Sequence, residues 1–246
     1  MKFIPIFFAI APAILIVIYF YRKDIGKPEP KGLIIKIFFL GVFSTIPAYI
    51  IELCFQLQLL KYVYLEQLVI NLIFSYFIAA TVEETLKYIV IINFAYKNKN
   101  FDEVMDGIIY TITVSMGFAC LENIKYVIEY DYSWNIILLR AFTSVPLHAI
   151  ASGIMGYYIG ISKFKKSPKE INLYKTRGLL IAIIIHGTFN MIVYTLPLIS
   201  FISAVIALLP FIVATYFLLQ NKIRIALQED FINGRTIDFR LYDWHL

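Results

Sequence analysis

Cysteine and charge are both scarce in this chain of 246 residues. Its two cysteines, Cys54 and Cys120, lie in apolar segments, so the sequence predicts neither a disulfide framework nor a thiolate metal cluster. Only 16% of the residues are charged, whereas about 25% are charged in average soluble proteins. Internal repeats, low-complexity segments and the zinc-binding HExxH pattern are also missing. What is abundant is apolar sequence, at 60% of the residues, which indicates a polytopic membrane protein.

Seven apolar runs reach membrane length, because about 20 helical residues span the hydrocarbon core of a bilayer. They are Phe3–Tyr21, Leu33–Phe55, Leu68–Tyr96, Gly107–Ile128, Ile136–Ile161, Gly178–Leu196 and Leu198–Leu219. The sequence therefore predicts an all-α integral membrane protein, a single bundle of about seven transmembrane helices. The boundary at Thr195-Leu196-Pro197 is the least marked. We expect one membrane domain over residues 1–220 and a polar tail over residues 221–246.

Loop charge predicts the orientation of these helices. Lysine and arginine concentrate in alternate loops, residues 22–31, 96–105 and 162–177, and in the tail. The remaining loops are poor in them. By the positive-inside rule, the tail is cytoplasmic and the N-terminus lies outside, in a multi-pass protein of the cell membrane. The net charge of +5 is therefore a topology signal, and we expect contact with the lipid bilayer and no nucleic-acid partner.

Two adjacent glutamates, Glu83 and Glu84, interrupt the third apolar run. A charged residue at the bilayer centre costs about 2.5–3.5 kcal/mol even on the lenient insertion scale. Lys87 lies three and four residues further on, so a buried structural ion pair is one interpretation. One lysine cannot neutralise two acids, however, and intramembrane carboxylates are functional candidates by default.

Other polar residues are expected at the same depth as this pair. His148, His186 and Asn190 lie roughly 12–21 Å from the cytoplasmic face, by the rise of an α-helix. A buried glutamate can remove a proton from water and later deliver it to a leaving amine. We expect His148 to share that water, and His186 and the Asn190 amide to stabilise an oxyanion. The alternative is that both histidines are satisfied core residues.

Besides Lys87, three polar residues are supporting candidates with structural alternatives. Asp106 begins a predicted helix, where a carboxylate caps free N–H groups. Glu122 and Asn123 either support catalysis or hydrogen-bond between helices. Arg140 is interpreted as snorkelling to the outer interface.

Four blocks of the sequence resemble the PrsW family of intramembrane proteases, which is related to the CAAX prenyl endopeptidase and bacteriocin-processing (CPBP) superfamily. These blocks are Glu83-Glu84-Thr85-Leu86-Lys87, Asp106–Tyr110 with Gly117–Asn123, Pro146-Leu147-His148, and His186-Gly187-Thr188-Phe189-Asn190. They place the motif-bearing core at about residues 68–196. The resemblance implies site-1-type cleavage of a membrane-anchored protein, such as an anti-sigma factor.

Two alternatives remain beside a glutamate-activated water. In the first, Glu83, His148 and His186 hold a zinc ion in the same protease. No HExxH segment supports a metal, so we favour an enzyme without a cofactor. In the second, the carboxylates and histidines form the proton relay of a transporter. The lack of an inverted repeat and of paired broken helices argues against a transporter.

Overall fold

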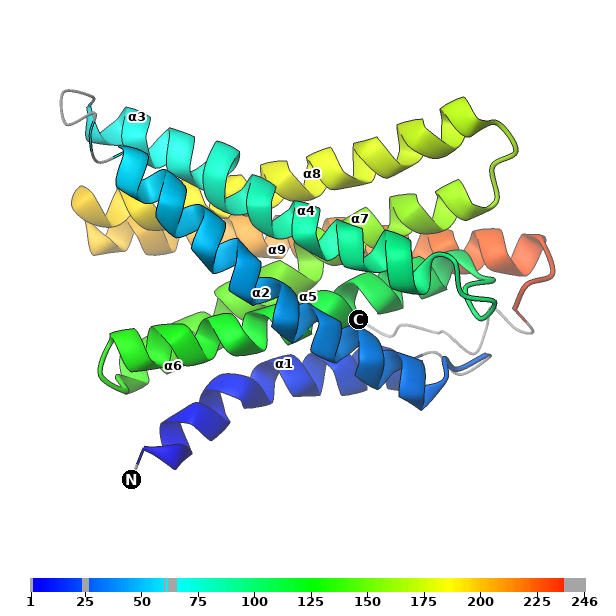
Figure 1. Cartoon of the computed structure of the whole chain (residues 1–246), viewed down its shortest axis with the longest axis horizontal. Coiled ribbons are helices and arrows are strands. Elements are labelled where there is room, and N and C mark those ends of the chain that lie inside the picture. Colours follow the sequence, from blue (N-terminus) through cyan, green and yellow to red (C-terminus); the bar gives the residue numbers. More distant parts are fainter. Residues whose placement is uncertain (1, 24–26, 60, 62–65, 237–246) are drawn as a thin grey trace.

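The computed structural model describes residues 2–23, 27–59, 61 and 66–236, and it contains helices and no strand within these ranges (Figure 1). The elements are α1 Phe3–Lys23, α2 Lys31–Leu59, α3 Gln67–Leu72, the π-helix η1 Ile73–Ala80, α4 Thr81–Val90, the π-helix η2 Ile91–Ala95, α5 Val104–Glu129, α6 Trp134–Phe142, α7 Ser144–Lys163, α8 Pro168–Thr195, the 3₁₀-helix η3 Leu196–Leu198 and α9 Phe201–Ile232.

Seven helical stretches among the described residues are long and apolar enough to cross a membrane, which confirms the predicted fold class. The third stretch joins α3, η1, α4 and η2 into one continuous helix, and the fifth consists of α6 and α7, which are separated at Thr143. The weakly marked boundary between the last two spans is real. There η3 ends α8, and the Ser200 hydroxyl accepts a hydrogen bond from the Ile202 amide at 3.2 Å at the start of α9.

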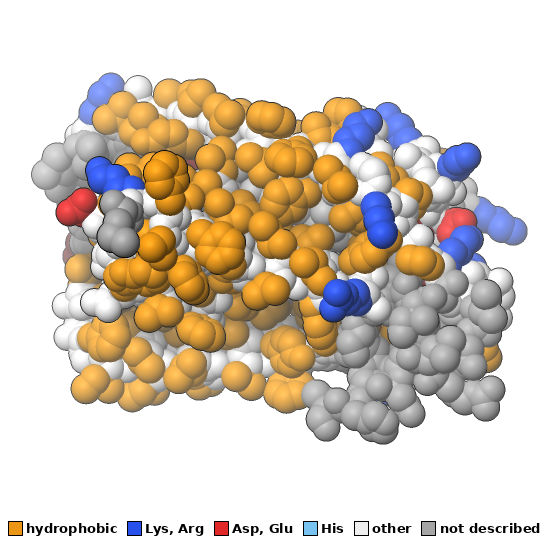
Figure 2. All heavy atoms as spheres, turned by 90° about the horizontal axis from the view of Figure 1, so that it is seen from below, with side chains coloured by type: hydrophobic (Ala, Val, Ile, Leu, Met, Phe, Trp, Pro, Cys, Tyr) orange, Lys and Arg blue, Asp and Glu red, His pale blue; other side chains and the backbone are white. Residues whose placement is uncertain are grey.

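Helix α5 lies at the centre of the bundle, among α1, α2 and α7 (Figure 1). In the apolar 18-residue segment of α5, 94% of the residues are buried inside the protein. In the corresponding segments of the first and last spans, 22% are buried. Large apolar side chains cover the outer helices, as a bilayer requires (Figure 2). Most of the lysines and arginines in that view gather at one end of the molecule. We call this the basic end; it carries loops 96–103 and 164–167. The opposite end is the far end.

Glycines let α5 and α7 approach backbone to backbone near the basic end. A Cβ atom at Gly107 would lie 2.3 Å from the carbonyl oxygen of Gly156, and one at Gly160 would lie 2.3 Å from that of Val104. No side chain fits in these gaps. Small residues of this kind allow close packing. Membrane helices depend on such packing because the hydrophobic effect does not drive their association within lipid.

The predicted polar tail differs from the structure, because α9 continues without a break to Ile232. Ile223, Ala226 and Leu227 recur at helical spacing and are buried in the main core. The fully buried Asp230 carboxylate then accepts hydrogen bonds from the Val104 and Met105 amides at 2.9 and 3.0 Å. Residues 221–232 therefore belong to the bundle. The end of the predicted tail, residues 237–246, lies outside the described residues.

Candidate active site

The two glutamates lie in the middle of the third membrane span, on α4. Glu84 and Lys87 are fully buried and Glu83 is 5% exposed. His148 reaches them from α7 and His186 from α8. Polar groups from three helices that are far apart in sequence therefore meet at one depth of the bundle, as the helical rise predicted.

Two π-helical segments, η1 and η2, border α4 on either side. The Thr81 hydroxyl donates to the Tyr76 carbonyl at 2.6 Å, which satisfies a backbone acceptor at the point where η1 becomes α4. The Tyr76 ring lies so close to Gly187 of α8 that a Cβ atom there would meet it at 2.4 Å. Wider π-turns rotate the residues that follow and occur frequently at functional sites. Here the η1–α8 contact fixes which way α4 presents its carboxylates.

Glu84 is completely engaged by protein groups. Its Oε1 accepts from Lys87 Nζ at 2.8 Å and contacts His186 Nδ1 at 2.9 Å. Its Oε2 accepts from the Ser152 hydroxyl at 3.2 Å. An ionised carboxylate only accepts hydrogen bonds, so His186 Nδ1 carries a proton in this contact, and in the neutral imidazole the Nε2 lone pair is then free.

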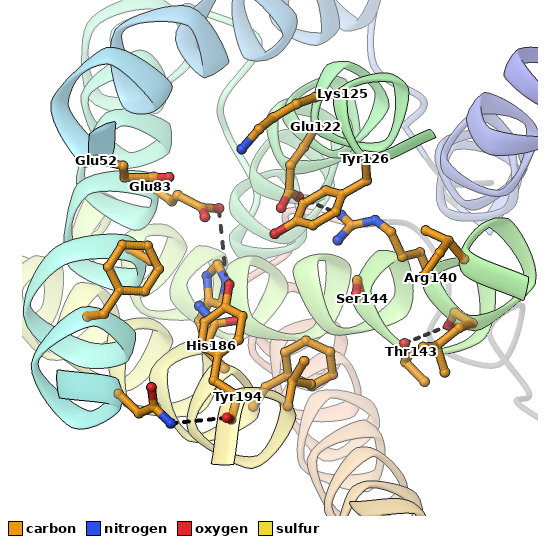
Figure 3. Close-up of a pocket in the computed structure, with 18 of the residues that line it drawn as sticks. Glu52, Glu83, Glu122, Lys125, Tyr126, Arg140, Thr143, Ser144, His186 and Tyr194 are labelled. Carbon is orange, nitrogen blue, oxygen red and sulfur yellow. Dashed lines mark hydrogen bonds and ion pairs between the residues drawn. The ribbon is translucent and has the colours of Figure 1, made fainter. Parts of the chain in front are cut away.

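Glu83 is held much more loosely than its neighbour. Its Oε2 lies 3.4 Å from Lys87 Nζ and 4.0 Å from His186 Nε2. It also lines a cavity, which Glu84 does not. Figure 3 shows the Glu83 side chain pointing toward His186, which lines the same cavity. Glu83 is therefore the carboxylate that a substrate and a water molecule can reach.

Both ring nitrogens of His148 have protein partners. Nδ1 lies 3.0 Å from Lys87 Nζ, and Nε2 lies 2.8 Å from Glu122 Oε2. Because an ammonium group only donates, Nδ1 is the acceptor and the proton on Nε2 is donated to Glu122. One neutral tautomer satisfies both contacts. Arg140 Nη2 lies 2.9 Å from the same Glu122 oxygen, so this carboxylate has a cationic partner as well as His148.

A cavity of about 880 Å³ runs from this cluster toward the far end of the bundle. Glu83, His148, His186 and Asn190 line one part of it. Its wall continues over residues of α2, α5, α8 and α9 to the chain near Leu59, Gln67 and Leu198. This volume is in the range of sites that enclose a ligand. The reactive groups therefore lie in a space that a peptide segment can enter.

Comparison with known proteins agrees with this geometry. A family model described as PrsW family intramembrane metalloprotease matches residues 29–215. The chain belongs to the PrsW family. It is 33% identical to Protease PrsW of Bacillus subtilis over 203 residues, 78% of this chain and 88% of that protein. It is also 33% identical to Protease PrsW of Oceanobacillus iheyensis over 225 residues, 91% of this chain and 96% of that protein.

A third relative, Protease PrsW of Geobacillus kaustophilus, is 34% identical over 183 residues, 74% of this chain and 76% of that protein. No solved structure matches the chain. The PrsW resemblance seen in the four sequence blocks is thereby confirmed, and this multi-pass membrane protein is an intramembrane protease, in place of the transporter alternative.

The family description names a metalloprotease, so the site was compared with what a catalytic zinc ion needs. Glu83, His148 and His186 each offer a ligand atom, and these atoms lie within 4.8 Å of one another. Two histidines and a glutamate form a common catalytic zinc set, and Glu84 on His186 Nδ1 is a usual supporting contact. His148, however, has no free lone pair, and the Lys87 ammonium contacts it. This arrangement does not fit zinc without breaking a contact of His148.

The structure does not bring all the predicted supporting residues to the cluster. Glu122 joins it through His148. Asp106 instead caps α5 at the basic end, where its Oδ2 accepts from the Asp102 and Glu103 amides at 2.8 and 2.7 Å. Asn123 donates to the Ala9 carbonyl at 2.9 Å and so fastens α1 to α5. Asp106 therefore caps a helix and Asn123 hydrogen-bonds between helices, which are the structural alternatives that the sequence allowed for them.

Arg140 does not snorkel to the interface as expected. Its side chain is 11% exposed, and its guanidinium lies 3.9 Å from the centre of the Tyr126 ring. It also donates from Nε to Asn123 at 2.7 Å. The helix breaks between α6 and α7 at Thr143, and Arg140, near the end of α6, lines the cavity from there. Contacts with buried protein groups therefore take the place of water around this guanidinium.

Sequence reasoning missed residues that line the cavity beyond the cluster. Tyr126 and Tyr194 face it from α5 and α8 (Figure 3). Glu52 faces it from α2. The signal for Glu52 was present, because it is a carboxylate inside the second predicted apolar run, and the rule that singled out Glu83 applies equally to it.

Proposed function

We propose that this PrsW-family protease cleaves a membrane-anchored protein with a water molecule activated by Glu83, without a metal ion. The observation that carries the proposal is the contrast between the two adjacent acids. Glu84 is occupied by three partners, whereas Glu83 faces the free Nε2 of His186 at 4.0 Å on the cavity wall. In the proposed site a water molecule between them donates one hydrogen bond to each group, and its oxygen keeps a lone pair for attack.

In the proposed reaction Glu83 is the general base and then the general acid. It takes a proton from the water as the water oxygen bonds to the peptide carbonyl carbon. When the carbon–nitrogen bond breaks, Glu83 returns that proton to the leaving amine. The Asn190 amide, one helical turn from His186 and on the cavity wall, donates to the oxyanion. Lys87 stabilises both carboxylates electrostatically.

His186 and His148 take different roles from those the sequence favoured. His186 Nε2, and not His148, offers a lone pair toward Glu83. His148 connects Lys87 to Glu122 and so holds the ammonium in place. We therefore assign water binding to His186 and a positioning role to His148.

The direction of the cavity supports cleavage near the outer face. The loops at the basic end carry the positive charge that the positive-inside rule assigns to the cytoplasm. The cavity extends toward the far end, which is then outside, together with the N-terminus. Site-1-type cleavage of a membrane-anchored protein, such as an anti-sigma factor, fits this geometry. The link to the CAAX prenyl endopeptidase and CPBP superfamily stays a prediction from the motifs.

A zinc-dependent mechanism on Glu83, His148 and His186 is the competing proposal, because these three residues converge. The deciding experiment measures metal content and activity together on the purified protein. We expect substoichiometric zinc and cleavage that survives a strong chelator. One zinc per chain, lost with activity and absent from His148→Ala and His186→Ala, would replace the glutamic mechanism and leave the protease assignment intact.

A further inference from the structure

We infer that Glu52 forms a subsite for a basic side chain of the substrate, close to the scissile bond. The inference rests on the proposed function, because it takes Glu83 as the residue that marks the place of cleavage. It adds a preference for lysine or arginine, which the motif residues do not supply.

Glu52 shares the cavity with the catalytic cluster but comes from a different helix. Residues one helical turn apart on α2, among them Ala48, Glu52 and Gln56, line the cavity along one face. Glu52 and Glu83 both line the cavity, and Figure 3 shows their side chains extending into it. A peptide whose carbonyl group reaches Glu83 therefore passes Glu52 with a residue near the cleaved bond.

Glu52 lacks the partner that each other acid near the cluster has. Its Oε1 is buried without a hydrogen-bond partner, and no ion pair among the described residues includes it. Glu84 has Lys87 and Glu122 has Arg140. Lys125 also lines the cavity, but its ammonium is placed over the Tyr49 ring, 4.3 Å from its centre.

A half-buried carboxylate whose Oε1 is buried without a hydrogen-bond partner favours a ligand that brings both a donor and a positive charge. Leaving such a group unsatisfied costs free energy, which binding of the right ligand removes. Among peptide side chains, lysine and arginine provide this at neutral pH. A hydrogen bond to a charged group discriminates against a neutral analogue by about 10- to 100-fold. The chemistry of Glu52 therefore predicts a basic residue at one substrate position.

The experiment uses the full-length protein in lipid nanodiscs and a library of single-span peptides. Each peptide carries randomised residues on the side that becomes the outer face, and the cleaved products are sequenced by mass spectrometry. For the wild-type protein we expect lysine or arginine to be enriched about 10- to 100-fold over glutamine at one position. Glu52→Gln should abolish that enrichment, and Glu52→Lys should reverse it in favour of glutamate and aspartate at the same position.

Two controls separate this inference from the proposed function. Glu66→Gln removes an exposed carboxylate that does not line the cavity, and it should leave the enrichment unchanged. Glu83→Gln should cleave every peptide at least about 100-fold more slowly; cleavage at the wild-type rate would refute the proposed function itself. If the wild type cleaves peptides without a basic preference, or Glu52→Gln retains the preference or slows all peptides equally, Glu52 does not set specificity. Reversal by Glu52→Lys cannot arise from misfolding, so it isolates the role of charge.

Discussion

Near the basic end α5 and α7 touch through glycine backbones, whereas toward the far end the same bundle encloses the cavity. At the first place a single added methyl group would collide with Gly156 or Val104. At the second, Tyr126 and Glu122 of the same α5 helix line open space. The proposed catalytic groups lie between the two regions, on the boundary of the packed one.

The difference shows how a membrane protease can hold polar groups and still admit a substrate. Glu84, Lys87 and His148 are fixed by partners with low exposure, so their burial is compensated. Glu83 and Asn190 face the cavity and keep capacity for a ligand. Preorganisation requires the rigid region, and binding requires the hollow one.

The largest expected effect is on the cavity side of this boundary. Glu83→Gln should lower the cleavage rate by at least about 10²–10⁴-fold, the range that a general base contributes. Because Glu83 has only long contacts, the variant should stay folded and inserted, as a thermal melting curve can verify. Glu84→Gln should lose activity and also melt at a lower temperature. Equal melting of the two variants would contradict the division of roles.

The next effect concerns the oxyanion. Asn190→Ala should reduce kcat by about 10²–10³-fold with little change in KM, since its amide acts mainly in the transition state. Steady-state kinetics on a cleavable membrane-anchored reporter measures this split. An increase in KM alone would instead assign Asn190 to substrate binding.

A smaller effect, on stability, is expected in the packed region. Gly156→Ala should destabilise the protein by about 1–3 kcal/mol, the usual cost of overpacking, because its Cβ would meet Thr111 Oγ1 at 2.1 Å. Val193→Leu adds a carbon to the cavity wall and should change stability much less. Denaturation in mild detergent compares the two variants. If the Gly156→Ala protein is as stable as the wild type, α5 and α7 can move apart to accommodate the added methyl group.

The last prediction assigns the two ends to the two sides of the membrane and should leave activity unchanged. Reporters fused at Lys99 and at Lys166, both in loops of the basic end, should each read as cytoplasmic. An outside signal from either fusion would reverse the direction in which the cavity opens.

Much of the fold was predictable, because a bilayer allows few backbone choices. Apolar runs of membrane length must form helices to satisfy their backbone groups, and the seven predicted runs do so. The end of the last helix was less predictable: Asn221, Lys222 and Arg224 interrupt the apolar run, yet α9 continues to Ile232. The prediction also failed for Arg140, whose interfacial position along the sequence did not reveal Glu122 beside it.

The sequence by itself determined that Glu83, Glu84, His148 and His186 lie at one depth, because depth follows from residue count along a helix. It could not decide which glutamate reaches the substrate. Adjacent residues point about 100° apart on a helix, and the π-helix η1 and its contact with Gly187 set the rotation. Side-chain partners from α5, α7 and α8 then occupied Glu84 and left Glu83 and Glu52 open. Those choices depend on packing between distant segments, so only the tertiary structure made them.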